Sequence, residues 1–216
     1  MRAGLLVLLL AAVTGAVARE ADDVFTRPAS TAELAALTRA PATSLSKAQV
    51  VRGKFVQRRY LAGLAQPLES SGTFRFARGV GIEWHTERPF DSQFVLTDAG
   101  ITQRDEGGEP LRISAADQPA LAVVSRVFFA LFALDLESLS HDFMLSGRTV
   151  GDTGWKIGLK PRAEALGSVF RQAIVSGAAS VHGVTLEDGN GDRSEIELSE
   201  VTYDPKGLSA DERRRF

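Results

Sequence analysis

Three short runs of alternating apolar residues organise the sequence between positions 68 and 96. Within each run the apolar side chains stand two residues apart, and glycines and a proline separate the runs. The six positions are Phe74, Phe76, Ile82, Trp84, Phe94 and Leu96. Such alternation puts each pair on one face of a β-strand. Three neighbouring antiparallel strands would therefore share one aromatic face.

Strand patterns continue on both sides of these runs. Residues 49–61 are rich in β-branched and aromatic side chains, with Val51, Gly53, Phe55 and Gln57 on one face. Further strands are predicted at 100–104, 141–150, 154–160, 169–176, 181–187 and 193–203, because Gly, Asp, Asn or Pro bounds each of them. The spacing is typical of a meandering antiparallel sheet of about ten to eleven strands.

Two segments have helical periodicity instead. Residues 30–41 begin with Ser30 followed by Glu33, which indicates a capping box, and Pro41 is expected to end the helix. Between 118 and 134 the apolar residues recur three and four apart, which predicts a helix that is apolar nearly all round. Its main line consists of Leu121, Val124, Val127, Phe128, Leu131 and Phe132. A further helical turn is expected over 135–140.

These elements predict an α+β fold. A sheet of this size that curls strongly needs its concave face filled, and the apolar central helix is the candidate to fill it. We expect an incomplete, strongly curved antiparallel β-barrel in which helices form a lid over an apolar cavity.

The N-terminus has the pattern of a secretory signal peptide. Arg2 precedes a short apolar run, and Ala16-Val17-Ala18 provides a small-residue cleavage site. We therefore expect residues 1–18 to be removed and residues 19–216 to form one exported, periplasmic domain. The chain has no cysteine, so its fold forms without disulfides, and we expect a protein without a lipidated cysteine anchor.

Composition and motifs exclude several kinds of function. With 25 Lys and Arg against 27 Asp and Glu, the net charge is −2, which argues against a nucleic-acid partner. The sequence has no nucleophile elbow, no His-Glu-x-x-His motif and no phosphate-binding glycine loop. The three histidines lack metal-ligand spacing, and residues 188–192 are predicted as a tight hairpin turn rather than a calcium loop. We expect no enzyme activity, no cofactor and no metal.

The aromatic face has two interpretations. Alternating Phe and Trp usually form ordinary core. However, the same alternation puts Arg78 on the face of Phe74 and Phe76 if the strand extends that far, and a guanidinium on an apolar face needs an acceptor. A hydrophobic-ligand site is therefore an alternative to plain core.

The sequence also resembles a known family. The residues that carry the resemblance are 55–57, Gly72 to Arg78, Ile82 to His85, Pro89-Phe90 and Asp98-x-Gly100, with a weaker continuation through 155–161 and the strands between 169 and 198. Their order and spacing are similar to those of the periplasmic outer-membrane lipoprotein carriers, the LolA-like proteins, of which this chain would be a divergent member.

The resemblance implies an unclosed barrel whose cavity carries acyl chains non-covalently. It implies an inner-membrane transporter as donor and an outer-membrane acceptor, and it gives Arg78 the role of holding the lid closed through hydrogen bonds to lid backbone. We expect a monomer whose cavity is lined by Phe55, Phe74, Phe76, Ile82, Trp84, Phe94, Leu96, Val124, Val127, Phe128, Leu131 and Phe132.

Two other functions remain open at this point. The same fold could carry a glycolipid, a polyene or another acylated product to a membrane exporter. A hydrolase of exported lipids is a third hypothesis, and it requires a polar, titratable cluster inside the cavity. A membrane-anchored acceptor of this fold is disfavoured because it would need a lipidated cysteine.

Overall fold

A computed structural model describes residues 23–117, 126–127, 129–167 and 170–216. The expected signal peptide lies outside these residues. Two helices, α1 (Thr31–Leu37) and α2 (Arg39–Lys47), follow a 3-10 turn at Asp23–Thr26, and three more are α4 (Leu136–Asp142), α5 (Glu164–Gly167) and α6 (Ala210–Arg213). The strands are β1 (Val50–Tyr60), β2 (Leu68–Ala77), β3 (Gly81–Arg88), β4 (Ser92–Thr97), β5 (Gly100–Asp105), β6 (Leu111–Ser114), β7 (Phe143–Val150), β8 (Gly154–Pro161), β9 (Phe170–Gly177), β10 (Val181–Asp188) and β11 (Arg193–Asp204).

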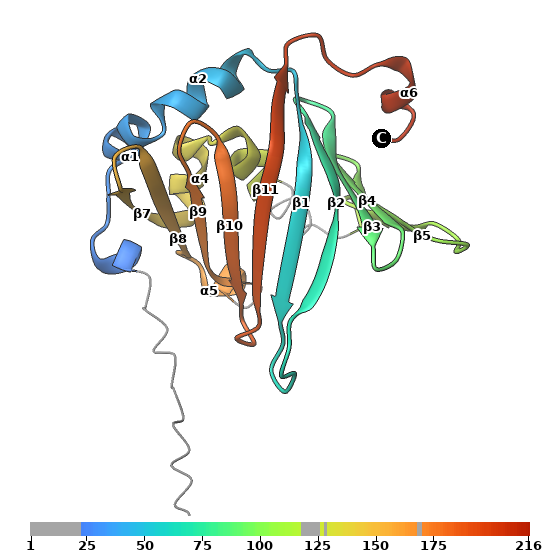
Figure 1. The fold of residues 1–216 in the computed structure, drawn as a ribbon, viewed down its shortest axis with the longest axis horizontal. Helices are drawn as coiled ribbons and strands as arrows, with labels where there is room; N and C mark the ends of the chain where they lie inside the picture. Colours follow the sequence, from blue (N-terminus) through green and yellow to red (C-terminus); the bar gives the residue numbers. More distant parts are fainter. Residues whose placement is uncertain (1–22, 118–125, 128, 168–169) are drawn as a thin grey trace, which may run out of the picture.

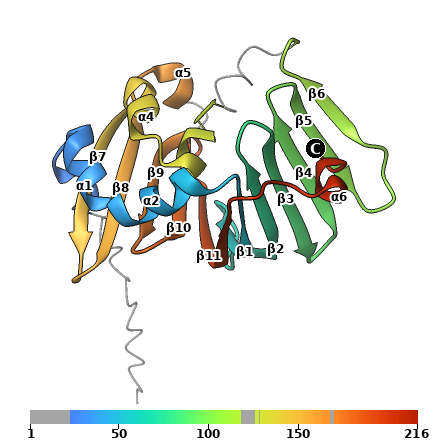
Figure 2. The same cartoon turned by 90° about the horizontal axis from the view of Figure 1, so that it is seen from above.

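All eleven strands form one antiparallel sheet in the order β6-β5-β4-β3-β2-β1-β11-β10-β9-β8-β7. The sheet is strongly curved, and its edge strands β6 and β7 do not pair with each other, so the barrel is incomplete (Figures 1 and 2). The predicted fold class is confirmed. We call the rim where β1 begins and β11 ends the upper rim, and the rim with the β1–β2 and β10–β11 hairpins the lower rim (Figure 1).

An irregularity between β1 and β11 helps the sheet to bend at its centre. The register of these strands shifts between Arg52 and Lys54, opposite Glu200, which has a φ of 51°. Such a bulge increases the local twist of a sheet. Gly53 lies at this irregularity, and a Cβ there would lie 2.9 Å from the carbonyl oxygen of Ser199 on β11 and 2.6 Å from the ring of Phe74 on β2.

Residues of the segment that connects β6 to β7 pack against the concave face. The described residues 126–127 and 129–133 are helical, and Val127, Ala130 and Leu134 are buried against the sheet. Helix α2 runs along the upper rim towards the start of β1 (Figures 1 and 2). Among the described residues, no helix combines the length and hydropathy needed to cross a membrane.

Local predictions were confirmed in part. The Ser30–Glu33 capping box is present, but Pro41 does not end the helix. A second helix, α2, begins at Arg39 and accommodates Pro41 in its first turn, where a missing N–H costs little. The strand expected at 141–150 begins only at Phe143, because α4 extends through Asp142, and β6 was not predicted.

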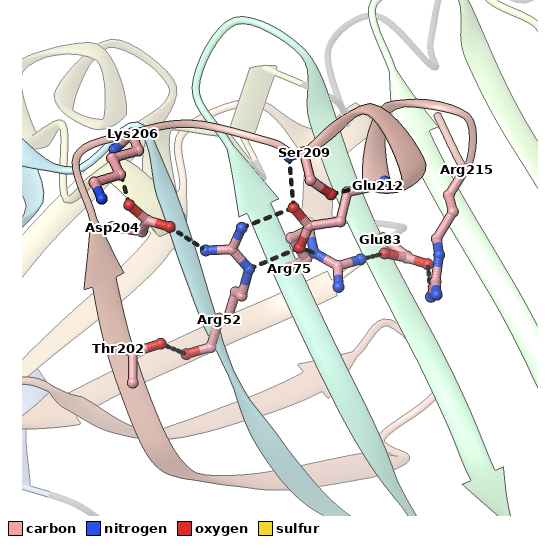
Figure 3. Close-up of polar contacts among 9 residues, drawn as sticks. All are labelled: Arg52, Arg75, Glu83, Thr202, Asp204, Lys206, Ser209, Glu212 and Arg215. Atoms are coloured by element: carbon pink, nitrogen blue, oxygen red, sulfur yellow. Dashed lines mark hydrogen bonds and ion pairs between the residues drawn. The ribbon is translucent and has the colours of Figure 1, made fainter.

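The C-terminal residues pack against the sheet. Residues 211–216 have the composition of a solvated tail, yet α6 is docked on the convex face of the sheet, a contact we call the C-terminal clasp (residues 205–216; Figure 3). Glu212 accepts two hydrogen bonds from Arg52, both 2.9 Å, and lies 3.1 Å from Nε of Arg75. Arg75 also pairs with Glu83, which is only 2% exposed, and Arg215 lies 3.4 Å from the same carboxylate.

Candidate functional site

A cavity of about 440 Å³ lies between the concave face of the sheet and the helical residues 126–127 and 129–133. This volume is within the range of roughly 300–1,000 Å³ that is common for small-molecule sites. The lining is mostly aliphatic and aromatic, and its apolar members are Leu45, Val51, Phe74, Ile82, Trp84, Phe94, Leu96, Val127, Leu131, Phe132, Phe143, Leu159, Ala173, Val175, Val181, Val184, Leu186, Ile196, Leu198 and Val201.

The three aromatic runs form one wall of this cavity. Phe74 pairs with Trp84 across β2 and β3, and Trp84 pairs with Phe94 across β3 and β4, so the three rings stand side by side. The Trp84 ring also stacks on Phe55, with the ring centroids 3.9 Å apart. Phe55 is fully buried behind this stack and supports the wall rather than lining it.

The helical segment forms the opposite wall. Val127, Leu131 and Phe132 line the cavity, and the Phe132 ring lies 5.8 Å from Phe76 and 6.0 Å from Phe74, measured between centroids. Phe76 packs in this aromatic contact and is not part of the lining. Val124 and Phe128 were also predicted as site residues, but they lie outside the described residues.

Arg78 lies at the upper rim, immediately after the end of β2. Its Nη2 donates to the carbonyl of Leu45 at 2.7 Å and its Nε donates to that of Ala48 at 3.2 Å. These carbonyls lie at the C-terminal end of α2, and that of Leu45 also accepts a hydrogen bond from the N–H of Ala48 at 3.1 Å. Because Leu45 also lines the cavity, Arg78 ties the sheet to a helix that covers it.

The sequence profile of the family described as "Outer membrane lipoprotein carrier protein LolA" matches residues 46–210. The chain belongs to this family. The match covers all eleven strands and ends within the C-terminal clasp. A search among curated proteins found no match.

Several solved structures are similar to this LolA-family chain, with low sequence identity. A LolA superfamily protein from Nitrosomonas europaea has a TM-score of 0.41 and 9% identity, and covers 78% of this chain and 94% of its own. The lipoprotein LppX from Mycobacterium tuberculosis has a TM-score of 0.46 and 11% identity, covering 84% and 100%. For LprF from Mycobacterium bovis the values are 0.37 and 11%, covering 84% and 96%.

Half of the cavity wall of this LolA-family protein was missed by sequence reasoning. Strands β8 to β11 contribute a second apolar surface, of which Leu186, Ile196 and Leu198 are examples. Their alternation was visible, but many polar residues interrupt it, and no aromatic cluster marked it. Only the curvature of the sheet brings this surface opposite the aromatic runs.

The cavity is mainly apolar, and its lining also includes a polar group at one end: Gln57, Arg59, Asp188, Asp192 and Ser194. His85 lies on the opposite face of β3 from the cavity and is 2.8 Å from the carboxylate of Asp91. In the part of the chain that the structure describes, no cluster of three or more His, Asp or Glu could hold a metal ion. Tyr203 is the phenol in the lining, and burial raises its pKa, so it is neutral at physiological pH. The apolar lining stabilises a bound molecule mainly by removing apolar area from water.

Proposed function

We propose that this protein is a periplasmic carrier that binds the acyl chains of lipoproteins and shuttles them from the inner to the outer membrane. A single observation carries the proposal: an apolar cavity lies under a helix in a chain of the lipoprotein-carrier family. The predicted residues that line the cavity would contact the cargo: Phe74, Ile82, Trp84, Phe94, Leu96, Val127, Leu131 and Phe132. Phe55 and Phe76 would support this wall from behind, and Val124 and Phe128 stay predicted members of the site. An inner-membrane transporter would load the carrier, and an outer-membrane acceptor would unload it.

Partial exposure of the cavity side chains supports a binding role. Trp84, Phe94 and Phe132 are large aromatic residues of the lining, and none of them is fully buried. A Phe in an ordinary core is usually covered completely by protein atoms, whereas a Trp often is not, so Phe94 and Phe132 are the more informative residues. An acyl chain that filled the space would complete their burial, with about 0.8 kcal/mol for each CH₂ group removed from water.

Arg78 would set the balance between closed and open forms of the carrier. Its two hydrogen bonds hold the end of α2 against the upper rim, and they must break if α2 moves away from the cavity. Opening therefore costs the net contribution of two hydrogen bonds from a charged group, which is roughly 1.5–3 kcal/mol for each after exchange with water.

The test is direct identification of the cargo. Protein purified from the periplasm should release acylated molecules on lipid extraction, and native mass spectrometry should show their mass on the intact carrier. The Arg78→Leu variant should change the amount of retained cargo and slow its handover to acceptor membranes, whereas Arg112→Leu, at an exposed position of β6, should behave as wild type. A carrier that is empty after gentle purification and binds no acyl chain in vitro would overturn the proposal.

A further inference from the structure

The cavity is not uniform along its length. On β1 the side chains that face it change from Val51, near the upper rim, to Gln57 and Arg59, near the lower rim. On β11 they change in the same direction, from Leu198 and Ile196 to Ser194. The cavity therefore has an apolar end under α2 and a polar end at the lower rim.

Strand register brings the polar residues together. Arg59 is directly opposite Ser194, and Gln57 is opposite Ile196. The neighbouring hairpin adds Asp188, at the end of β10, and Asp192, just before β11, and both line the same cavity. We call Gln57, Arg59, Asp188, Asp192 and Ser194 the polar end.

The hairpin backbone fixes the two carboxylates. Oδ1 of Asp188 accepts hydrogen bonds from the N–H groups of Asn190 and Asp192, at 2.9 and 3.0 Å. Oδ1 of Asp192 accepts from the N–H of Ala62, in the adjacent loop, at 3.0 Å. The second oxygen of each carboxylate is left to face other groups.

The arginine is held less tightly. Nη2 of Arg59 lies 3.9 Å from Oδ2 of Asp192, which is beyond hydrogen-bond distance, and the Arg59 side chain is 52% exposed. Its charge is compensated by a nearby carboxylate, but its N–H groups can still donate to a guest. The polar end thus offers donors on β1 and acceptors on the β10–β11 hairpin.

We infer that the polar end is a subsite for the cargo's head group, and that it selects uncharged head groups rich in hydroxyl or amide groups. This inference rests on the proposed carrier function. A hydroxyl or amide both donates and accepts, so it can bond to the carboxylates of Asp188 and Asp192 and to Arg59 and Gln57 at once. A phosphate ester that is ionised only accepts and would meet two carboxylates. An ammonium only donates and would meet the guanidinium.

The inference also orients the cargo. Acyl chains would extend from the lower rim towards the apolar end, beneath α2 and Arg78. The head group would lie between the β1–β2 loop and the β10–β11 hairpin. Release through the upper rim would then require the chains to move first, while the head group stays bound.

Three amphiphiles with the same twelve-carbon chain test the selectivity: dodecyl maltoside, dodecyl phosphate and dodecylammonium, each below its critical micelle concentration. Binding to the full mature chain can be followed by calorimetry and by tryptophan fluorescence, since Trp84 lines the cavity and Trp155 does not. The maltoside should bind about tenfold more tightly than either charged compound, as expected for loss of a hydrogen bond to a charged group.

Two variants with opposite effects make the test specific. Asp192→Asn retains an acceptor for Ala62 but leaves Arg59 without its counter-charge, so the affinity for dodecyl phosphate should rise several-fold relative to the maltoside. Arg59→Gln removes the cation of the polar end, so it should lower the affinity for dodecyl phosphate below that of wild type. Arg58→Gln is the matched control, because Arg58 is the adjacent residue of β1, pairs with Glu69 and Glu197 on the convex face, and should leave the preference unchanged.

The outcomes distinguish failure of the head-group subsite from failure of the carrier function. Equal affinities for the three head groups, or a preference that neither Asp192→Asn nor Arg59→Gln alters, would overturn the head-group subsite and leave acyl-chain binding intact. Failure of all three amphiphiles to bind would overturn the carrier function itself, and the subsite with it. If Asp192→Asn does not fold, the Arg59→Gln variant decides the question alone.

Discussion

Replacing Glu212 by glutamine should weaken the C-terminal clasp and destabilise the fold. Glu212 is the residue through which α6 meets both Arg52 and Arg75 on the convex face (Figure 3). Glutamine keeps the capping box with Ser209, since Glu and Gln serve equally at that position. The substitution therefore removes the charge and leaves the helix cap in place.

The size of the effect follows from the pKa of Glu212. Hydrogen bonds from Arg52, the largest cause, lower this pKa from 4.5 to about 2. A shift of that size corresponds to at most roughly 3 kcal/mol, since one pKa unit is about 1.4 kcal/mol. Because the Glu212 side chain is 17% exposed and solvent screens part of the interaction, we expect Glu212→Gln to cost about 1–2 kcal/mol at pH 7.

The pH dependence distinguishes this interaction from a packing defect. The pKa is lower in the folded state, so the contribution to stability is fully present above about 4.5 and is lost as the pH falls through about 2. Urea unfolding of wild type and Glu212→Gln should therefore give free energies that differ most at pH 6–7 and converge towards pH 2. Glu197→Gln is the control, because Glu197 pairs with Arg58 on the same face but is 67% exposed. It should cost at most about 0.5 kcal/mol.

A Glu212→Gln variant no less stable than Glu197→Gln would show that the clasp contributes nothing through this carboxylate. A difference that stays constant between pH 7 and pH 2 would refute the electrostatic explanation, even if the variant is unstable.

Two further predictions concern the sheet and the cavity. Gly72→Ala should destabilise the protein by about 2 kcal/mol or more in urea unfolding, because its Cβ would lie 1.9 Å from the carbonyl oxygen of His85, whereas Gly108→Ala, with its nearest atom at 3.6 Å, should be close to neutral. Equal stability of the two variants would contradict this account of the β2–β3 contact. In a series of alkyl maltosides, each added CH₂ should tighten binding about fourfold until the cavity is full. Calorimetric affinities that are independent of chain length would contradict burial of the chain.

Much of the fold could be predicted from local patterns. Alternation at Phe74, Trp84 and Phe94 identified three strands that the structure pairs as antiparallel neighbours, and the capping box at Ser30 marked the start of α1. These features depend on residues close together in the chain. The start of a second helix at Arg39 was harder to predict. A proline is accepted both in the first turn of a helix and just after a helix end, and the local sequence does not distinguish these two positions.

Arg78 has hydrogen-bond acceptors, as the sequence suggested, but it does not lie on the strand from which they were inferred. Alternation along β2 suggested that its guanidinium would need acceptors, but β2 ends at Ala77, and the side chain reaches its acceptors from the loop beyond the strand. The acceptors are the carbonyls of Leu45 and Ala48 at a helix end, and the side chains of the sequence do not indicate which backbone carbonyls a distant arginine can reach.

The sequence by itself determined the strands, their buried faces and the aromatic wall, because strand alternation and turn chemistry act over a few residues. The tertiary structure decided the rest. Curvature of the sheet placed β8 to β11 opposite the aromatic wall and thereby made a cavity with one polar end. Pairing of β1 with both β2 and β11 brought Arg52 beside Arg75, and so created the site where the C-terminal residues dock. These charges are separated by up to 160 residues in the chain, and only the folded sheet brings them together.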